Sequence, residues 1–239
     1  GGTHGIGRAC VEKLSNAGYF VVFSGRDCKA GGEIAKGFKN TVFVKGDVSS
    51  PREIRQVVDH AVELGAGKLY GLVNNAGMSL RKPFGESTLD DWETIININS
   101  RSVFLFTKYC IEPLCAAKGS VVMMSSAAGN VGVDGLALYC ASKAAIIGLS
   151  KALALEFGRW VRINALCPGQ ISTRMMANAL KLPEQRRRIE EAIPAGKTGT
   201  AQEVANAVFW LISPDSSFVN GAVIPIDGGE TAGIFENES

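Results

Sequence analysis

Hydrophobic and polar positions alternate in blocks along the chain. Short apolar runs rich in Val, Ile and Phe recur, and longer mixed stretches separate them. Such runs predict buried strands, and the stretches between them predict helices. The predicted strands cover residues 20–24, 41–45, 69–74, 120–124, 162–166 and 222–226. Strands that alternate with helices favour an α/β fold with a parallel sheet covered on both faces.

The predicted helices cover residues 8–17, 51–64, 89–114, 137–157 and 202–212. Pro51 follows Ser50, and proline is well tolerated in the first turn of a helix. Asp90 and Asp91 place acids in the first turn of the third helix. The chain shows no internal repeat and no interdomain linker, so one domain over residues 1–239 is expected.

Glycines open the chain, at Gly1, Gly5 and Gly7, directly before the first predicted helix. Glycine lets the backbone approach a phosphate closely, and the amino end of a helix attracts anions. The spacing is G-x-x-x-G-x-G rather than the usual G-x-G-x-x-G. The pattern predicts a site for a dinucleotide pyrophosphate; the alternative is an ordinary glycine-rich turn.

Tyr139 and Lys143 lie four residues apart, and Ser126 precedes them. In a helix, residues four apart share one face. A phenol with a pKa of about 10 is a poor base at neutral pH, but a neighbouring ammonium lowers that pKa. The three residues therefore predict a proton donor and acceptor with a hydroxyl beside it. The alternatives are an interface aromatic, a surface lysine and a strand-end hydroxyl.

These motifs occur with Asn74-Asn75-Ala76-Gly77, Asn99 and Pro168-Gly169 in one order along the chain. Together they resemble the short-chain dehydrogenase/reductase family in its single-domain branch, over essentially the whole chain. The sequence is similar to the 3-oxoacyl-carrier-protein reductase and glucose dehydrogenase types. The resemblance implies a doubly wound, Rossmann-type parallel sheet. It also implies hydride transfer between NADP(H) or NAD(H) and a ketone or secondary alcohol.

The resemblance implies a role for each catalytic residue. Tyr139 is the general acid or base, and Lys143 lowers its pKa and bonds the nicotinamide ribose. Ser126 positions the substrate oxygen, and Asn99 holds a water in a proton relay. Asn97 lies two residues before Asn99, but Asn99 fits the family spacing better.

The resemblance also implies the cofactor contacts. Asp47 bonds the adenine amino group, although the same stretch can be read as a helix N-cap region with Ser49 or Ser50 as the cap. Ile171 and Thr173 hold the nicotinamide carboxamide. The full set of expected contacts is Gly1, Thr3, His4, Gly5, Ile6, Gly7, Arg26, Asp47, Val48, Asn75, Ala76, Gly77, Tyr139, Lys143, Pro168, Gly169, Ile171 and Thr173.

The end of the second family strand indicates which dinucleotide binds. NAD enzymes usually place a carboxylate there for the ribose diol, whereas this chain has Gly25 followed by Arg26. A guanidinium can pair with a 2′-phosphate, which favours NADP(H) and leaves NAD possible. The alternative is a solvated Arg26, with Asp27 on the ribose hydroxyls.

One strand of the family fold is not found in the sequence. In the family a strand precedes the phosphate loop and lies in the middle of the sheet, but nothing here precedes Gly1. We therefore expect a longer native chain with residues before Gly1.

Composition narrows the remaining classes. The net charge of +2 gives no sign of a nucleic-acid surface. The longest apolar stretch, 136–157, contains Lys143, Lys151 and Glu156, so no membrane helix is expected. The cysteines and the two histidines show no metal-ligand spacing. Reduced cysteines in a cytoplasmic protein are the preferred interpretation.

Residues 174–198 are less regular and are expected to form a helical lid over the substrate. The helix from Leu136 and the segment 221–229 resemble the surfaces through which the family forms homotetramers. The leading hypothesis is an NADP(H)-preferring oxidoreductase acting on a small carbonyl or alcohol substrate. The alternatives are an NAD-dependent sugar or polyol dehydrogenase and a non-catalytic dinucleotide-binding regulator.

Overall fold

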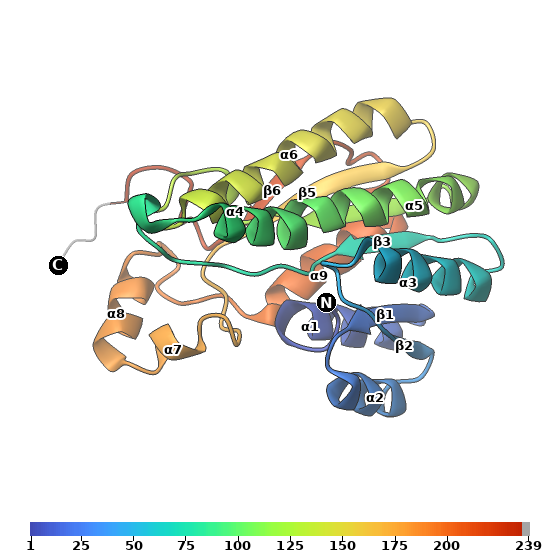
Figure 1. Ribbon diagram of the computed structural model, residues 1–239, viewed down its shortest axis with the longest axis horizontal. Coiled ribbons are helices and arrows are strands. Elements are labelled where there is room, and N and C mark those ends of the chain that lie inside the picture. Colours follow the sequence, from blue (N-terminus) through green and yellow to red (C-terminus); the bar gives the residue numbers. More distant parts are fainter. Residues whose placement is uncertain (236–239) are drawn as a thin grey trace.

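The computed structural model describes residues 1–235, and its parallel strands are covered by helices on both sides (Figure 1). The helices are α1 (Gly5–Asn16), α2 (Cys28–Gly37), α3 (Pro51–Leu64), α4 (Leu89–Ile96), α5 (Ser102–Ala117), α6 (Ala137–Phe157), α7 (Ala177–Leu180), α8 (Pro183–Glu191) and α9 (Ala201–Ile212). The strands are β1 (Val21–Gly25), β2 (Thr41–Lys45), β3 (Gly71–Asn74), β4 (Ser120–Met124), β5 (Arg162–Pro168) and β6 (Val223–Ile226). The predicted α/β class is confirmed.

Every strand pair is parallel, but the strands form two separate ladders. A two-stranded sheet has the order β1-β2, and a four-stranded sheet has the order β3-β4-β5-β6. All six predicted strands are present, and their ends shift by no more than two residues. In the β4–β5 ladder Met124 pairs with Leu166. This register brings the residues that follow β4 beside the end of β5, at the carboxyl edge of the sheet.

The helix predicted over residues 89–114 is wrong as a single element. It is divided into α4, a π-helical turn (Asn97–Arg101) and α5, which ends at Ala117. Inside the turn, the Asn99 side chain bonds the Met78 backbone, and the Ser102 hydroxyl donates to the Ile98 carbonyl. A π turn inserts an extra residue into the helix, and such turns are frequent at functional sites.

The sequence also gave no prediction for α2. Its glycines, Gly31 and Gly32, have a low intrinsic helix propensity. The helix begins because the Asp27 carboxylate accepts a hydrogen bond from the Ala30 amide. At Gly31 a Cβ atom would lie 2.4 Å from the Phe43 ring, so a glycine is needed for close packing against β2.

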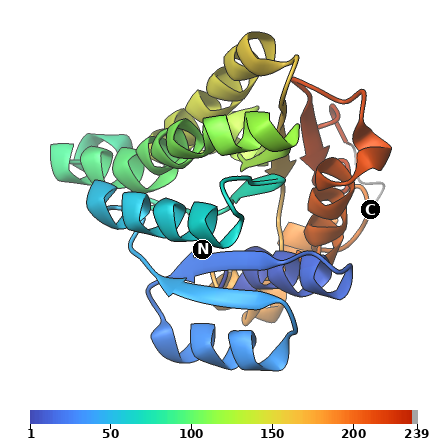
Figure 2. The ribbon, with the colours of Figure 1, turned by 90° about the vertical axis from the view of Figure 1, so that its right-hand side faces the viewer.

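The core lies on both faces of the four-stranded sheet, and every residue of β4 is buried. On one face α1 and α9 pack against Val122, Met124 and Leu166. On the other face α5 and α6 pack against Val121, Met123 and Ile163. Figure 2 shows these two layers. α6 is long and apolar enough to pass a length-and-hydropathy test for a membrane span, a test that core helices of globular proteins also pass.

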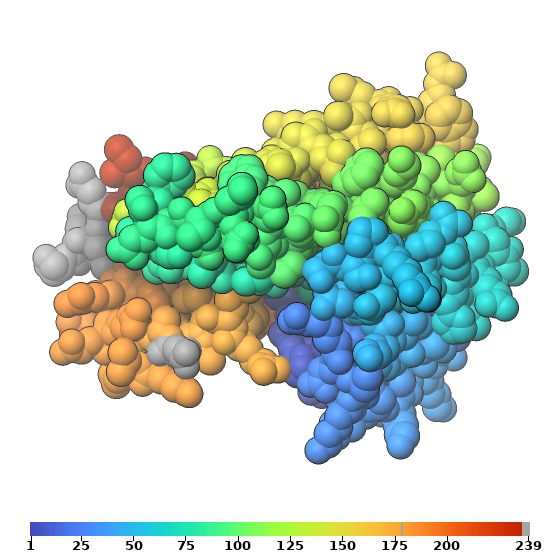
Figure 3. Space-filling model, in the orientation of Figure 1, coloured from blue at the N-terminus to red at the C-terminus, as the bar shows by residue number. Residues whose placement is uncertain are grey.

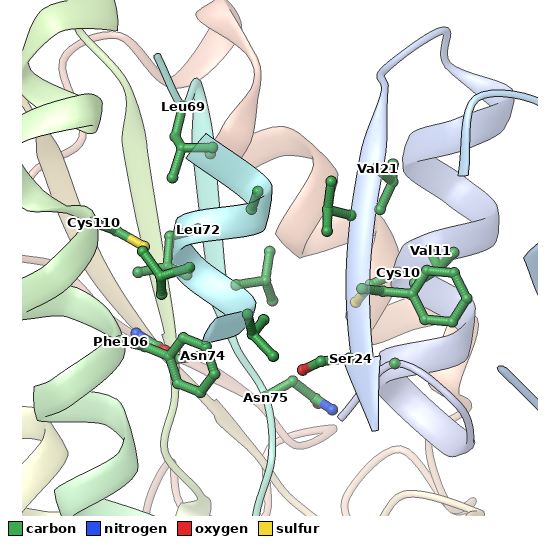
Figure 4. Close-up of a pocket in the computed structure, with 18 of the residues that line it drawn as sticks. Cys10, Val11, Val21, Ser24, Leu69, Leu72, Asn74, Asn75, Phe106 and Cys110 are labelled. Atoms are coloured by element: carbon green, nitrogen blue, oxygen red, sulfur yellow. The ribbon is translucent and has the colours of Figure 1, made fainter. Parts of the chain in front are cut away.

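A cavity of about 590 Å³ separates β1 from β3. Its walls are mainly apolar. Val21 and Cys10 lie on one side of the cavity, and Leu72 and Phe106 lie on the other (Figure 4). Within residues 1–235, no strand pairs with the edges of β1 and β3 that face this cavity. The cavity lies where the sequence led us to expect a further strand, and none of Ser126, Tyr139 or Lys143 lines it.

Residues 174–198 contain α7 and α8 and project from the sheet as a separate lobe (Figure 3). The two ends of this segment are bonded together. The Ser172 amide donates to the Gly199 carbonyl at 2.8 Å, and the Gly199 amide donates to the Gln170 carbonyl at 2.9 Å. The Ser172 and Thr198 hydroxyls also meet at 2.8 Å. The predicted helical segment therefore folds as a closed loop with a fixed base.

Candidate active site

Side chains from three elements meet at the carboxyl edge of the four-stranded sheet. Ser126 follows β4 and caps a short 3-10 turn (Ala127–Gly129), where its hydroxyl oxygen accepts a hydrogen bond from the Ala128 amide at 3.2 Å. Tyr139 and Lys143 lie in the first turns of α6, and Asn99 lies in the π-helical turn. We call these four residues the tyrosine cluster.

Lys143 is buried, with 3 % of its surface exposed. Its ammonium donates to the Met124 carbonyl at 2.8 Å and lies 5.7 Å from the centroid of the Tyr139 ring. Burial lowers the pKa of Lys143 to about 8, because the charged form loses its hydration. A lysine of this kind exchanges its proton near neutral pH far more readily than an exposed one.

Tyr139 departs from the expectation that Lys143 lowers its pKa. Burial raises the pKa of the Tyr139 phenol, and a hydrogen bond with Ser126 opposes that shift. The ammonium bonds the Met124 carbonyl and sits over the ring, so its charge is not directed at the phenolic oxygen. The phenol is therefore protonated at neutral pH, the state that a proton donor requires.

Asn99 is fully buried and held by three bonds. Its Oδ1 accepts from the Met78 amide at 2.9 Å, and its Nδ2 donates to the Met78 carbonyl at 2.9 Å and to the Ser142 hydroxyl at 3.0 Å. A Cβ atom placed on Gly77 would lie 3.3 Å from Asn99 Oδ1 and 3.3 Å from Lys143 Nζ. Gly77 therefore lies beside both Asn99 and Lys143, where a larger residue would press on the two side chains.

The glycines of the chain start are sterically required. A Cβ atom on Gly7 would collide with the Gly1 carbonyl oxygen, and one on Gly1 would lie 2.9 Å from Ala76 Cα. The side-chain Nδ2 of Asn75 donates to the Gly1 carbonyl at 2.9 Å. The predicted residues Gly1, Gly7, Asn75 and Ala76 are thus brought together, next to the amino end of α1.

The same loop reaches the other end of the expected cofactor site. A Cβ atom on Gly5 would lie 3.4 Å from the Thr173 methyl group. Gly5 has a φ of +51°, a conformation that favours glycine. The turn after β5, with Pro168, Gly169, Ile171 and Thr173, therefore runs alongside the glycine loop, and Ile6 lies between Gly5 and Gly7 on the same turn.

Five polar residues surround the end of β1, and we call them the Arg26 corner: Thr3, His4, Arg26, Asp27 and Asp47. His4 Nε2 lies 3.5 Å from Asp27 Oδ2, and Arg26 lies 3.8 Å from Asp47 Oδ2. The Arg26 side chain is 77 % exposed. A Cβ atom on Gly25 would lie 2.8 Å from the Thr3 methyl group, so a larger residue at position 25 would displace Thr3.

Asp47 also has a structural role. Its carboxylate accepts from the Ser49 amide at 2.8 Å, and this backbone hydrogen bond is the main cause that lowers the pKa of Asp47. Ser50 caps α3, and Val48 lies between the two. The helix-cap interpretation of this stretch is therefore correct for Ser50, and it leaves the second Asp47 oxygen toward Arg26.

The residues present fit a nicotinamide dinucleotide. The glycine loop leaves an approach that side chains would fill, and the free amides at the start of α1 suit a pyrophosphate. The sequence did not reveal three polar residues in and around the tyrosine cluster: Ser100, Ser125 and Ser142. Ser142 bonds the Asn99 side chain and the Tyr139 carbonyl, Ser125 bonds the Lys143 carbonyl, and Ser100 bonds the Ser142 carbonyl. Their proximity to the predicted residues in the sequence was the available signal, but most of their bonding partners are backbone atoms, which no sequence pattern marks.

Comparison with known proteins gives the family. Residues 1–231 match a family model described as Enoyl-(Acyl carrier protein) reductase. A 2-(S)-hydroxypropyl-CoM dehydrogenase of Xanthobacter autotrophicus is 34 % identical, covering 97 % of this chain and 94 % of its own. A 3-oxoacyl-[acyl-carrier-protein] reductase of Aquifex aeolicus is 35 % identical, covering 96 % and 94 %. A solved structure of ElxO with NADP bound superimposes with a TM-score of 0.91 at 29 % identity, covering 98 % of this chain and 97 % of that chain.

The chain belongs to the short-chain dehydrogenase/reductase family. It is accordingly an NAD(P)-dependent oxidoreductase with a Rossmann-type fold.

Proposed function

We propose that the protein transfers a hydride between NADP(H) and a ketone or secondary alcohol, with Tyr139 as the general acid or base. One observation carries this proposal: a protonated phenol, the Ser126 hydroxyl and a buried ammonium converge at the carboxyl edge of β4. Hydroxyl groups in this arrangement can donate hydrogen bonds to a substrate carbonyl oxygen, and the phenol can then protonate that oxygen. The relatives named above support the same chemistry, since one acts as an alcohol dehydrogenase and the other as a ketone reductase by name.

Proton transfer is the part of the reaction that this chain's own residues perform. In reduction, Tyr139 donates its proton to the substrate oxygen as that oxygen gains charge. Ser126 would hold the oxygen in place: its hydroxyl oxygen accepts from the Ala128 amide, and its O–H, which is directed at Tyr139, can donate to a substrate oxygen beside the phenol. Bound nicotinamide supplies or accepts the hydride.

Lys143 and Asn99 would restore the phenolic proton. A pKa of about 8 lets Lys143 release and regain a proton near neutral pH. Its ammonium bonds the Met124 carbonyl and lies beside Gly77, and Asn99 Oδ1 also lies beside Gly77. We propose that Lys143 also bonds the nicotinamide ribose and that Asn99 orders the relay water.

NADP(H) is the proposed cofactor, with Arg26 as the phosphate partner. The Asp27 carboxylate is engaged by the Ala30 amide and faces His4, so the interpretation in which Asp27 takes the ribose hydroxyls is less favourable. Arg26 is mostly exposed, and its ion pair with Asp47 is long. Its guanidinium can therefore turn to a phosphate at small cost.

The substrate would lie between the tyrosine cluster and the segment 174–198. Met175 and Leu182 are exposed on this segment, 57 % and 59 % respectively, so apolar surface is available to cover a substrate. We propose that this segment is a lid hinged at its bonded base, Ser172 to Thr198. A cytoplasmic homotetramer is proposed for the assembled protein; Leu155 on α6, 89 % exposed, supports an interface on that helix.

A panel of ketones and alcohols, assayed with NADPH, NADH and their oxidised forms by absorbance of the reduced nicotinamide, tests the proposal. We expect turnover on at least one ketone with a preference for NADPH. Turnover of sugars or polyols with NAD alone would favour a dehydrogenase of that type. Cofactor binding without turnover on any compound would favour a non-catalytic regulator.

A further inference from the structure

Helix α6 accepts hydrogen bonds from two neighbouring elements at the turn that follows Tyr139. The Ser100 hydroxyl, from the π-helical turn, donates to the Ser142 carbonyl at 2.9 Å. The Ser125 hydroxyl, from the end of β4, donates to the Lys143 carbonyl at 2.8 Å. These two carbonyls are consecutive along α6, so two serines on different elements hold a single point of the helix.

Both carbonyls already serve the helix. In α6 they accept from the amides four residues later, Ile146 and Ile147, and a carbonyl oxygen has a second lone pair for another donor. The serine bonds are therefore additional to the helical ones. They fix the position of α6 relative to its neighbours and hold this turn of the helix more firmly than the helical bonds alone.

The same turn receives further bonds from the neighbouring elements. Lys143 Nζ donates to the carbonyl of Met124, the residue just before Ser125. Asn99, the residue just before Ser100, donates to the Ser142 hydroxyl, which in turn donates to the Tyr139 carbonyl at 2.7 Å. Each flanking element thus contributes two consecutive residues, and together they contact both the side chains and the backbone of this turn.

We propose that Ser100 and Ser125 are positioning residues for Tyr139 and Lys143, and that their hydroxyls clamp α6 so that the phenol and the ammonium face Ser126 and Asn99. The proposal rests on the proposed function, because it concerns the geometry of that reaction. Neither serine is assigned contact with substrate or cofactor. Misplacement of reacting groups by about 1 Å can cost up to about 100-fold in rate, so loss of one clamp should be measurable.

Ser150 provides a matched control. It is fully buried in the same helix, and its hydroxyl donates to the Ile147 carbonyl at 2.9 Å, but this bond stays within α6. Ser150→Ala therefore removes a buried serine hydroxyl of α6 without releasing the helix from β4 or from the π-helical turn.

The experiment compares Ser100→Ala, Ser125→Ala and Ser150→Ala in steady-state kinetics with the best ketone of the panel. We expect each clamp variant to lower kcat about ten-fold with little change in KM for ketone and NADPH, because binding residues are untouched. Ser150→Ala should keep the wild-type kcat. Ser100→Thr retains the hydroxyl, and we expect it to recover most of the kcat lost in Ser100→Ala.

Hydrogen exchange of the protein without nucleotide gives a second readout. We expect faster exchange at the Ile146 and Ile147 amides in Ser100→Ala and Ser125→Ala, since the helix is released locally. Should Ser125→Ala fail to fold, Ser100→Ala, its threonine rescue and the exchange data still decide the matter. Clamp variants with kcat equal to that of Ser150→Ala would overturn the proposal while leaving the proposed function intact. An inactive wild type would overturn both.

Discussion

The tyrosine cluster and the Arg26 corner lie at the carboxyl ends of strands, yet they are built in opposite ways. In the cluster, Lys143 and Asn99 are buried, and their side chains bond backbone atoms and the buried Ser142 hydroxyl. In the corner, Arg26 is mostly exposed, and the ion pairs of Arg26 and His4 are 3.8 and 3.5 Å long. Long exposed pairs contribute little free energy.

This difference indicates where change is tolerated. We expect substitutions in the cluster to remove the proposed proton transfer or to leave a buried polar group without its hydrogen-bond partner. Substitutions in the Arg26 corner should alter the choice of cofactor while leaving fold and proton transfer intact. A series of variants, taken from the largest expected effect to the smallest, tests that contrast.

Tyr139→Phe removes the phenolic proton while keeping the ring. We expect kcat to fall at least ~100-fold, the scale of general acid–base catalysis, because the proposed proton donor to the substrate oxygen is lost. NADPH affinity, measured by fluorescence titration, should be retained. Near-normal turnover in this variant would refute the proposed mechanism.

Lys143→Met should make the protein inactive but more stable. The pKa of Lys143 is lowered from 10.5 to about 8, so at pH 7 the folded state carries a buried ammonium that is costly to desolvate. The unfolded state binds more protons than the folded state between these two pKa values, so wild-type stability rises with pH across that window. Below this pH window the free-energy cost of burying the ammonium is constant, on the order of 3 kcal/mol at most.

Urea unfolding of wild type and Lys143→Met at pH 7 and near pH 10 measures this effect. We expect the variant to be the more stable of the two at pH 7, by less than the full cost because the bond to the Met124 carbonyl is lost. Its advantage should shrink as pH rises. An advantage that grows with pH would contradict the burial argument.

Arg26→Ala should change cofactor preference more than rate. We expect KM for NADPH to rise about ten-fold and KM for NADH to stay near its wild-type value, because only the phosphate loses a charged partner. Arg159→Ala, an exposed arginine near the amino end of β5, is the matched control. Asp27→Asn, which keeps an oxygen for the helix cap, should change the KM for NADH least; a large loss there would revive the alternative in which Asp27 holds the ribose.

The sequence predicted the strands well because β4 and its neighbours are short, apolar and bounded by turns. Of the residues it grouped, Asn75 bonds Gly1, Ser126 bonds Tyr139, and Asn99 and Lys143 both lie beside Gly77. Their catalytic and cofactor-binding roles stay predictions. Three things escaped it. The π-helical turn depends on bonds between Asn99 and the Met78 backbone, which are distant in the chain.

α2 escaped prediction because its glycines serve packing against Phe43 rather than helix propensity. The sequence also failed to predict that the pKa of Tyr139 is raised rather than lowered. Spacing places Lys143 one turn from Tyr139, but only the folded structure shows that the ammonium is committed to the Met124 carbonyl. A hydrogen bond to a backbone atom places no requirement on the identity of the residue that carries that atom. Most of the structural features that the sequence did not predict depend on bonds of this kind.

The bond between Asn75 and Gly1 has a mechanical consequence. It joins the glycine loop, which leads through α1 into the β1–β2 layer, to the residue that follows β3 in the four-stranded sheet. A nucleotide that touches both Arg26 and Thr173 would join the two sheets at a second place, so saturating nucleotide should raise the midpoint of the melting transition.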